Sequence, residues 1–263
     1  MTGNTMRRTW SERPVLGAWC TTGSPAAIEL MADSGYDFLL IDAQHGEVGM
    51  AHLEPMLRAF GDNDVTPVVR VPHGDYATIG RALDAGAQTV IVPMVETRAQ
   101  AEEAARAMRY SPDGGRSWAV TRAARRLGSD PASVNSEVAL LVMIETAAGL
   151  ANAAAIAGVP GVDGIFVGPA DLGLTLGQAP GSALLAPEVE TALDTVAGVC
   201  AENGRVAGLA GGIEYAERGF KVLTIANDRA LLSAGRDLAT SGVADLARHA
   251  ATPVAGTPAP QVR

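Results

Sequence analysis

The chain has 263 residues, a hydrophobic content of 48% and a formal net charge of −9. This length and apolar content suit one domain with a large core, and the acidic balance argues against nonspecific binding to nucleic acid or to an anionic membrane surface. The first residues lack the apolar stretch of a signal peptide, and no apolar run approaches the roughly 20 residues of a membrane span.

Cysteine and lysine are both scarce. Cys20 and Cys200 form no CxxC pair and have no nearby histidine at zinc-ligand spacing, so we expect reduced thiols in the core of a cytoplasmic protein. Lys221 is the single lysine among the 20 Lys and Arg residues. An enzyme that forms a Schiff base through lysine therefore has only this position to use.

Eight short apolar runs rich in β-branched residues follow one another along the chain. They are Val15–Trp19, Asp37–Ile41, Pro67–Val71, Thr89–Val95, Ala139–Ile144, Gly164–Val167, Val206–Leu209 and Lys221–Ile225. Runs that are apolar throughout, rather than alternating, favour strands buried on both faces, as in a parallel sheet.

Helical patterns separate most of these runs. Ser24 and Pro25 suit the N-cap and the first position of a helix that Gly35 ends. Three later segments rich in helix formers are Glu96–Tyr110, Glu188–Asn203 and Asp228–His249, the last with a predicted break near Ser241-Gly242.

Eight strands alternating with helices are typical of the (β/α)8 TIM barrel, and a doubly wound sheet is the alternative fold. No composition shift marks a domain boundary, so we predict a single barrel domain over residues 1–251. The Pro- and Ala-rich residues 252–263 are predicted to form a disordered tail.

Ionisable residues follow four of the predicted strands. Asp42 and His45 follow the second strand, Arg70 ends the third, Glu145 follows the fifth and Asp171 follows the sixth. Active sites of TIM barrels lie at the C-terminal ends of the strands, and buried charges there are costly unless they are paired or bind a metal. These five residues are therefore the candidates for a catalytic site.

Glu145 and Asp171 come from adjacent strands and have no cysteine or histidine as an immediate neighbour. Two carboxylates in this setting suit a hard cation such as Mg²⁺ or Mn²⁺. The alternative is that Glu145 caps the helix that starts at Thr146 and that Asp171 caps its own turn.

An imidazole oriented by a carboxylate is a standard general base, so His45 with Asp42 is the candidate base. The alternative is that His45 is an ordinary loop residue beside a turn aspartate. Arg70 either polarises a substrate carbonyl or forms a structural ion pair with Glu145 or Asp42. The small-residue turn Gly168–Leu172 favours a bound carboxylate, because the N–H groups of Ala170 and Asp171 can approach it.

Six strings in this order resemble the HpcH/HpaI aldolase family, the class II pyruvate aldolases typified by 4-hydroxy-2-oxoheptanedioate aldolase, over about Leu16 to Leu246. The strings are Leu40–Gly46, Pro67–Arg70, Val92–Val95, Arg109-Tyr110 with Gly115-Arg116, Ile144–Thr146 and Val167–Leu172.

The resemblance implies a metal-dependent aldolase that forms or cleaves 4-hydroxy-2-oxo acids from a pyruvate-type 2-oxo acid and an aldehyde. It implies Mg²⁺, Mn²⁺ or Co²⁺ bound by Glu145 and Asp171, an Asp42–His45 base, and Arg70 facing the keto or enolate oxygen. Gly168, Ala170 and Asp171 would contact the substrate. The resemblance also implies small-molecule substrates and a hexamer in which a C-terminal helix packs on a neighbouring subunit.

Two features depart from these aldolases. Met143 stands where a glutamine is usual, two residues before the metal-binding glutamate, and Ser117–Ser129 differs, with Trp118 and the arginines 122, 125 and 126. In such enzymes the second region helps to shape the aldehyde side of the pocket. The identity of the aldehyde therefore stays open.

Two rival enzyme functions are an oxaloacetate decarboxylase and a CoA-thioester lyase of the same superfamily, and the non-enzymatic rival is a metabolite-binding barrel. A Schiff-base mechanism is disfavoured because Lys221 lies at the start of its strand, on the face of a barrel that serves stability.

Overall fold

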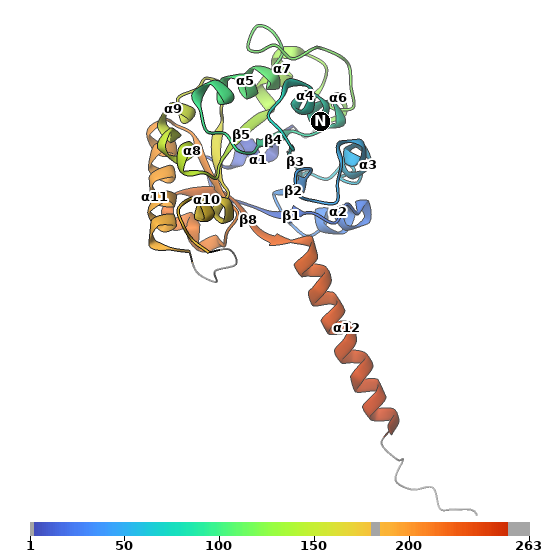
Figure 1. The fold of residues 1–263 in the computed structure, drawn as a ribbon. Coiled ribbons are helices and arrows are strands. Elements are labelled where there is room, and N and C mark those ends of the chain that lie inside the picture. The colour runs from blue at the N-terminus through green and yellow to red at the C-terminus, as the bar shows by residue number, and fades with distance from the viewer. Residues whose placement is uncertain (1–2, 180–184, 252–263) are drawn as a thin grey trace, which may run out of the picture. The chain divides into compact units, whose positions relative to one another are not determined.

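A computed structural model describes residues 3–179 and 185–251 of the chain, so the predicted disordered tail lies outside the described residues. Eight parallel strands pair in chain order and close into a barrel, with β1 beside β8 (Figure 1). The strands are β1 Val15–Cys20, β2 Phe38–Asp42, β3 Thr66–Arg70, β4 Thr89–Val92, β5 Ala139–Ile144, β6 Gly164–Val167, β7 Val206–Leu209 and β8 Phe220–Asn227. The predicted (β/α)8 TIM barrel is confirmed.

Helices between the strands cover the outside of the barrel (Figure 1). The α-helices are α1 Thr5–Thr9, α2 Pro25–Ala32, α3 Leu53–Arg58, α4 Tyr76–Ala85, α5 Arg98–Met108, α6 Ala124–Leu127, α7 Pro131–Glu137, α8 Ala147–Ala151, α9 Ala153–Ala157, α10 Pro169–Thr175, α11 Pro187–Glu202 and α12 Asp228–Ala251, and the 3-10 helices are η1 Met50–His52 and η2 Ile213–Arg218. Ser24 caps α2 as expected, because its side chain accepts a hydrogen bond from the N–H of Ala27.

The chain divides into a compact unit of Met1–Asp228, which holds the barrel, and a second unit from Arg229 onward, which holds nearly all of α12. The predicted break near Ser241-Gly242 is wrong, since α12 continues through both residues to Ala251. One glycine in a helix costs only about 1 kcal/mol, and the surrounding alanines and leucines favour the helix. Among the described residues, no helix is both long and apolar enough to cross a membrane.

Side chains of successive strand residues point alternately into the barrel and out toward the helices. Phe38 and Leu40 of β2 belong to an inner cluster, whereas Leu39 and Ile41 pack in a separate outer cluster. Because both faces of the strands are buried, the sequence shows continuous rather than alternating apolar runs. Cys20 and Cys200 are buried and free, as predicted.

The same alternation directs the polar residues at the strand ends. Asp42 lies an even number of residues after Phe38 and Leu40, as Arg70 does after Val68 and Glu145 after Leu141 and Met143. These five apolar residues belong to the inner cluster. The strand pattern therefore directs all three ionisable side chains toward the axis of the barrel at its C-terminal end.

The fourth strand is shorter than expected. It ends at Val92 rather than at Val95, and at Met94 the backbone adopts a positive φ of 55°. Such a conformation is uncommon for a residue with a side chain and costs of the order of 1 kcal/mol or more. The strain lies beside the candidate site, because Met94 contacts Glu145.

Candidate active site

Asp42 and Arg70 form a buried, two-pronged ion pair at the ends of neighbouring strands. Nε of Arg70 donates to Oδ1 of Asp42 at 2.9 Å, and Nη2 donates to Oδ2 at 2.6 Å. The strand register places the two residues directly opposite each other. A structural ion pair with Asp42 was one alternative for Arg70, and this pair is present. It fixes the plane of the guanidinium.

Trp19, at the end of β1, completes this arrangement. Its indole N–H donates to Oδ2 of Asp42 at 3.1 Å, and the guanidinium of Arg70 lies 4.7 Å from the centre of its ring. Burial raises the pKa of Asp42, but the hydrogen bond and charge of Arg70, with the bonds from Trp19 and the backbone of His45, outweigh it and hold that pKa below its usual value. Asp42 is thus a stable anion whose role is to hold its neighbours.

The turn after β2 depends on the same carboxylate. Oδ1 of Asp42 accepts the backbone N–H groups of Gln44 at 3.0 Å and of His45 at 3.2 Å. A β-carbon on Gly46 would lie 2.3 Å from the carbonyl oxygen of Asp42, so only glycine fits there.

His45 is exposed on this turn. Its link to Asp42 runs through the backbone N–H, and both oxygens of Asp42 are already occupied by Arg70 and Trp19. Asp42 therefore positions the turn that carries His45, whereas the predicted dyad assumes a contact with the imidazole itself. The catalytic role of the pair stays a prediction.

Glu145 is 2% exposed and follows the last residue of β5. Its Oε1 accepts the backbone N–H of Met94 at 2.8 Å. Thr146, not Glu145, caps α8, because its hydroxyl accepts the N–H of Gly149 at 3.0 Å. The alternative in which Glu145 serves as the helix cap is therefore wrong.

Glu145 and Asp171 are close enough to interact electrostatically. Burial is the main cause that raises the pKa of Glu145, and the charge of Asp171 raises it further. The hydrogen bond from the N–H of Met94 and the charges of Arg70 and His45 lower it. The net result is a pKa above the usual value. Asp171, Arg70 and His45, from three other strand ends, thus each lie within electrostatic range of Glu145. Among the described residues, no group of three or more His, Cys, Asp and Glu side chains could hold a metal ion.

The Gly168–Leu172 turn forms the first turn of α10. Gly168 is its N-cap and makes no side-chain capping bond, and the first helical bond runs from the N–H of Leu172 to the carbonyl of Gly168 at 3.1 Å. A β-carbon on Gly168 would lie 2.6 Å from Oε2 of Glu145. Glycine at this position therefore makes room for the glutamate carboxylate.

Met143 occupies the inner position two residues before Glu145. It is 1% exposed, and its sulfur lies 3.9 Å from Nη1 of Arg70. A thioether is a weak acceptor, so the hydrogens of this nitrogen stay largely available. The methionine fills the barrel below the site without adding a polar group to it.

Three residues at the C-terminal ends of the strands were not predicted from the sequence. Trp19 and Met94 contact Asp42 and Glu145, and Asp228 accepts the N–H and hydroxyl groups of Thr21 and Thr22 where β8 meets the end of β1. A tryptophan at the end of an inner strand pattern was a usable signal for Trp19. A positive φ at a methionine leaves no signal in the sequence.

Other charged residues noted in the sequence lie elsewhere. Lys221 is the second residue of β8, so it lies at the N-terminal end of the barrel as predicted. Arg109 and Arg116 form ion pairs with Asp163 and Asp84. Arg126 of α6 and Arg122 just before it donate to the backbone carbonyls of Val65 and Leu57, so within one chain these two do not line the site.

Comparisons with known proteins agree with this architecture. A family model described as HpcH/HpaI aldolase/citrate lyase matches residues 16–220. A hydroxypyruvate/pyruvate aldolase of Rhizorhabdus wittichii is 39% identical over 239 residues, 88% of this chain and 95% of that protein. A 5-keto-4-deoxy-D-glucarate aldolase of Klebsiella pneumoniae is 34% identical over 221 residues, 81% of this chain and 86% of that protein. The crystal structure of an HpcH/HpaI aldolase/citrate lyase family protein from Burkholderia cenocepacia superposes with a TM-score of 0.83 at 35% identity, covering 91% of this chain and 99% of that one.

Proposed function

This chain belongs to the HpcH/HpaI aldolase/citrate lyase family and is a carbon–carbon lyase, and we propose that it is a metal-dependent aldolase acting on pyruvate-type 2-oxo acids. The observation that carries the proposal is that the buried carboxylate of Glu145 lies within electrostatic range of Asp171, Arg70 and His45. The relatives named as hydroxypyruvate/pyruvate and 5-keto-4-deoxy-D-glucarate aldolases support the same class of substrate.

The two carboxylates fit a divalent cation. Glu145 is buried with a raised pKa, and its second carboxylate oxygen makes no hydrogen bond to a described residue; Asp171 is exposed and makes none either. Two oxygen ligands from the protein leave positions for water and substrate, as magnesium and manganese sites commonly do. When bound, such an ion supplies a Lewis acid that acidifies the carbon next to a keto group.

Arg70 is the residue that we propose to face the developing negative charge. Nε and Nη2 of Arg70 donate to Asp42, so Nη1 is the nitrogen left for an enolate oxygen. Donors fixed before the reaction stabilise the charge without having to reorganise. We assign Asp42 and Trp19 the positioning of this guanidinium.

His45 is the candidate base. In the direction of cleavage it accepts the proton of the 4-hydroxyl group, the C3–C4 bond breaks, the aldehyde leaves, and the electron pair stays on the enolate opposite Arg70. In the direction of synthesis it removes a proton from C3. The N–H groups of Ala170 and Asp171, in the first turn of α10, are free to bind the substrate carboxylate.

The test is a turnover assay with pyruvate and hydroxypyruvate against a panel of aldehydes, run with Mg²⁺, Mn²⁺ or Co²⁺ and again with EDTA. Aldol formation that requires a divalent metal is expected. Oxaloacetate and an acyl-CoA belong in the same assay, because exclusive activity on either would replace this proposal with decarboxylation or thioester cleavage. Binding of these acids without turnover would indicate a metabolite-binding barrel.

The oligomer is proposed on the surface of α12. Leu231, Leu232, Leu238 and Val243 of this helix are 45–76% exposed, and a helix that exposes several large apolar side chains usually packs on another surface. We propose that the partner is a second copy of the chain in a hexamer. Light scattering should give six chains for the full protein and fewer for a chain ending at Asp228.

A further inference from the structure

A cavity of about 250 Å³ lies at the end of the barrel opposite the candidate active site. Its wall includes Pro67 near the start of β3, Gly86 shortly before β4, and the short helix α6. Arg70 ends the same strand β3 at the other end of the barrel. A molecule bound in this cavity therefore cannot be the one that reacts at the strand ends.

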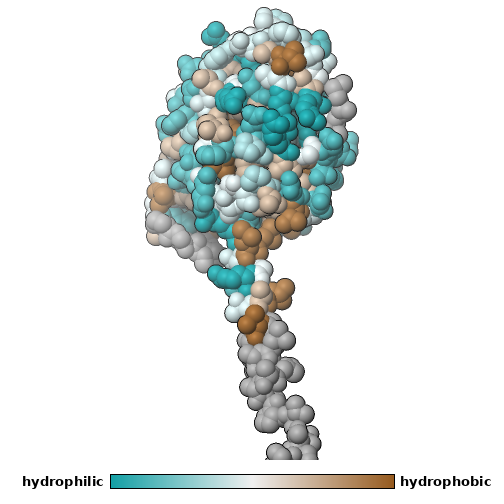
Figure 2. Space-filling view, turned by 90° about the vertical axis from the view of Figure 1, so that its right-hand side faces the viewer, coloured by the Kyte–Doolittle hydropathy of each residue, from teal (hydrophilic) through white to brown (hydrophobic). Residues whose placement is uncertain are grey.

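Four arginines line this cavity. They are Arg58 of α3 and Arg122, Arg125 and Arg126 on or beside α6, and the carboxylate in the lining is Asp62. Four positive charges against one negative charge leave three net positive charges in the lining, on a chain with a net charge of −9. Glu54 pairs with Arg58 from outside the lining and offsets part of this charge. The upper half of the molecular face in Figure 2 is mainly hydrophilic.

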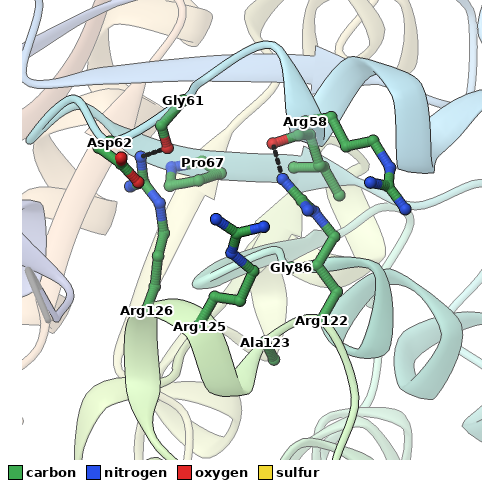
Figure 3. A pocket seen from close by; sticks show the side chains of 10 residues that line it. Arg58, Gly61, Asp62, Pro67, Gly86, Arg122, Ala123, Arg125 and Arg126 are labelled. Atoms are coloured by element: carbon green, nitrogen blue, oxygen red, sulfur yellow. Dashed lines mark hydrogen bonds between the residues drawn. The ribbon is translucent and has the colours of Figure 1, made fainter.

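The arginines differ in how they are held. Arg126 donates to four backbone carbonyls between α3 and β3, so its position is fixed by the fold. Arg122 makes one long bond, from Nη2 to the carbonyl of Leu57 at 3.5 Å. The guanidinium of Arg125 has no hydrogen-bond or ion-pair partner among the described residues, and it points between those of Arg122 and Arg126 (Figure 3).

The like charges oppose one another. Burial lowers the pKa of Arg122, and the charges of Arg58 and Arg125 lower it further. Arginines gathered without enough acid to neutralise them favour an anion between them. Guanidinium groups match the oxygens of a phosphoryl group in both geometry and charge.

We propose that this cavity binds the phosphoryl group of a phosphorylated small molecule, with Arg125 and Arg122 as its main donors. A phosphate monoester carries a charge of about −1.5 to −2 near neutral pH, which is close to the charge that the lining needs. The cavity has room for such a group with a short organic part. It is a second ligand site, independent of the proposed aldolase chemistry.

The test is calorimetric titration of the full, metal-loaded protein with glycerol 3-phosphate, which has no carboxylate or keto group to compete at the strand ends. We expect saturable binding that weakens as salt is raised and that an excess of pyruvate leaves unchanged. Arg125→Ala should weaken binding at least about tenfold, and Arg125→Lys should retain part of it. Arg106→Ala, an exposed arginine on α5 outside the cavity, should bind like the wild type.

Absent binding would overturn the proposal, as would binding that pyruvate displaces or that Arg125→Ala leaves intact. If Arg125→Ala instead dissociates the oligomer and glycerol 3-phosphate does not bind, the cavity holds part of a second copy of the chain and the proposal is wrong. Arg125 is exposed and its guanidinium is unpartnered among the described residues, so its replacement should not prevent folding, and thermal unfolding of each variant checks this.

Discussion

Gly168 lies so close to Glu145 that a β-carbon would meet Oε2 of the glutamate at 2.6 Å. The residue after β6 thus sets the position of the carboxylate that follows β5. This contact predicts that Gly168→Ala displaces the carboxylate and weakens metal binding at least about tenfold, the scale for a lost neighbour of a metal ligand. Manganese titration of the variant measures it.

The matched control for this variant is Gly80→Ala in α4, where a β-carbon would meet nothing within 4 Å. This change should leave metal binding unchanged and stabilise the helix by about 0.5–1 kcal/mol. Wild-type metal affinity in Gly168→Ala would show that the glycine serves only the turn.

Arg70→Lys keeps a positive charge but loses the two-pronged bond with Asp42 and the contact with Trp19. We expect kcat to fall at least about 10²-fold, the scale for a lost donor to a developing oxyanion, with a smaller change in KM. Steady-state kinetics with pyruvate and one accepted aldehyde measure both constants. Arg98→Lys, which alters an exposed pair with Glu102, is the control and should react normally. An equal loss in both variants would mean that Arg70 has no special role.

His45→Ala should lower the aldol rate at least about 10²-fold, as expected when a general base is lost. Its side chain is exposed and Asp42 holds the turn through the backbone N–H, so the variant should fold and bind metal normally. Exchange of the C3 protons of pyruvate with deuterium, followed by NMR, isolates the proton-transfer step. Exchange at the wild-type rate would remove His45 from the mechanism.

Asp228 makes the stability of the barrel depend on pH. Burial raises its pKa, but the bonds from Thr22 and Thr21 outweigh burial and hold the pKa below its usual value. A carboxyl with a lowered folded-state pKa stabilises the fold above its unfolded pKa of about 3.9 and loses that contribution as pH falls through the folded pKa.

Asp228→Asn should therefore be less stable than the wild type by about 1–3 kcal/mol near pH 7. The difference should shrink below about pH 4. Urea unfolding of both proteins across this pH range tests the expectation. A difference that stays constant with pH would show that the charge of Asp228 is unimportant.

The fold was predictable because burial on both faces leaves a plain pattern in the sequence. All eight runs became strands, and the two-residue period directs Asp42, Arg70 and Glu145 to the barrel axis. Local rules also succeeded at Ser24, whose side chain caps α2.

Other features depend on contacts between distant segments. The left-handed backbone at Met94 exists beside the buried carboxylate of Glu145, 51 residues away, and Asp228 meets Thr21 across 207 residues. We expected Asp42 to contact the imidazole of His45. The register of β2 and β3 places Asp42 opposite Arg70, so the carboxylate of Asp42 pairs with that guanidinium. The glycine rule that predicted a break in α12 was outweighed by the flanking helix formers.

The most direct measurement is a titration with Mn²⁺, followed by electron paramagnetic resonance, of the wild type, Glu145→Gln and Asp171→Asn, with Glu103→Gln as a control on an exposed carboxylate of α5. The proposed site predicts one tightly bound ion per chain in the wild type and in the control, and affinity weakened at least about 100-fold in both site variants. Tight binding that survives the loss of either carboxylate would contradict it.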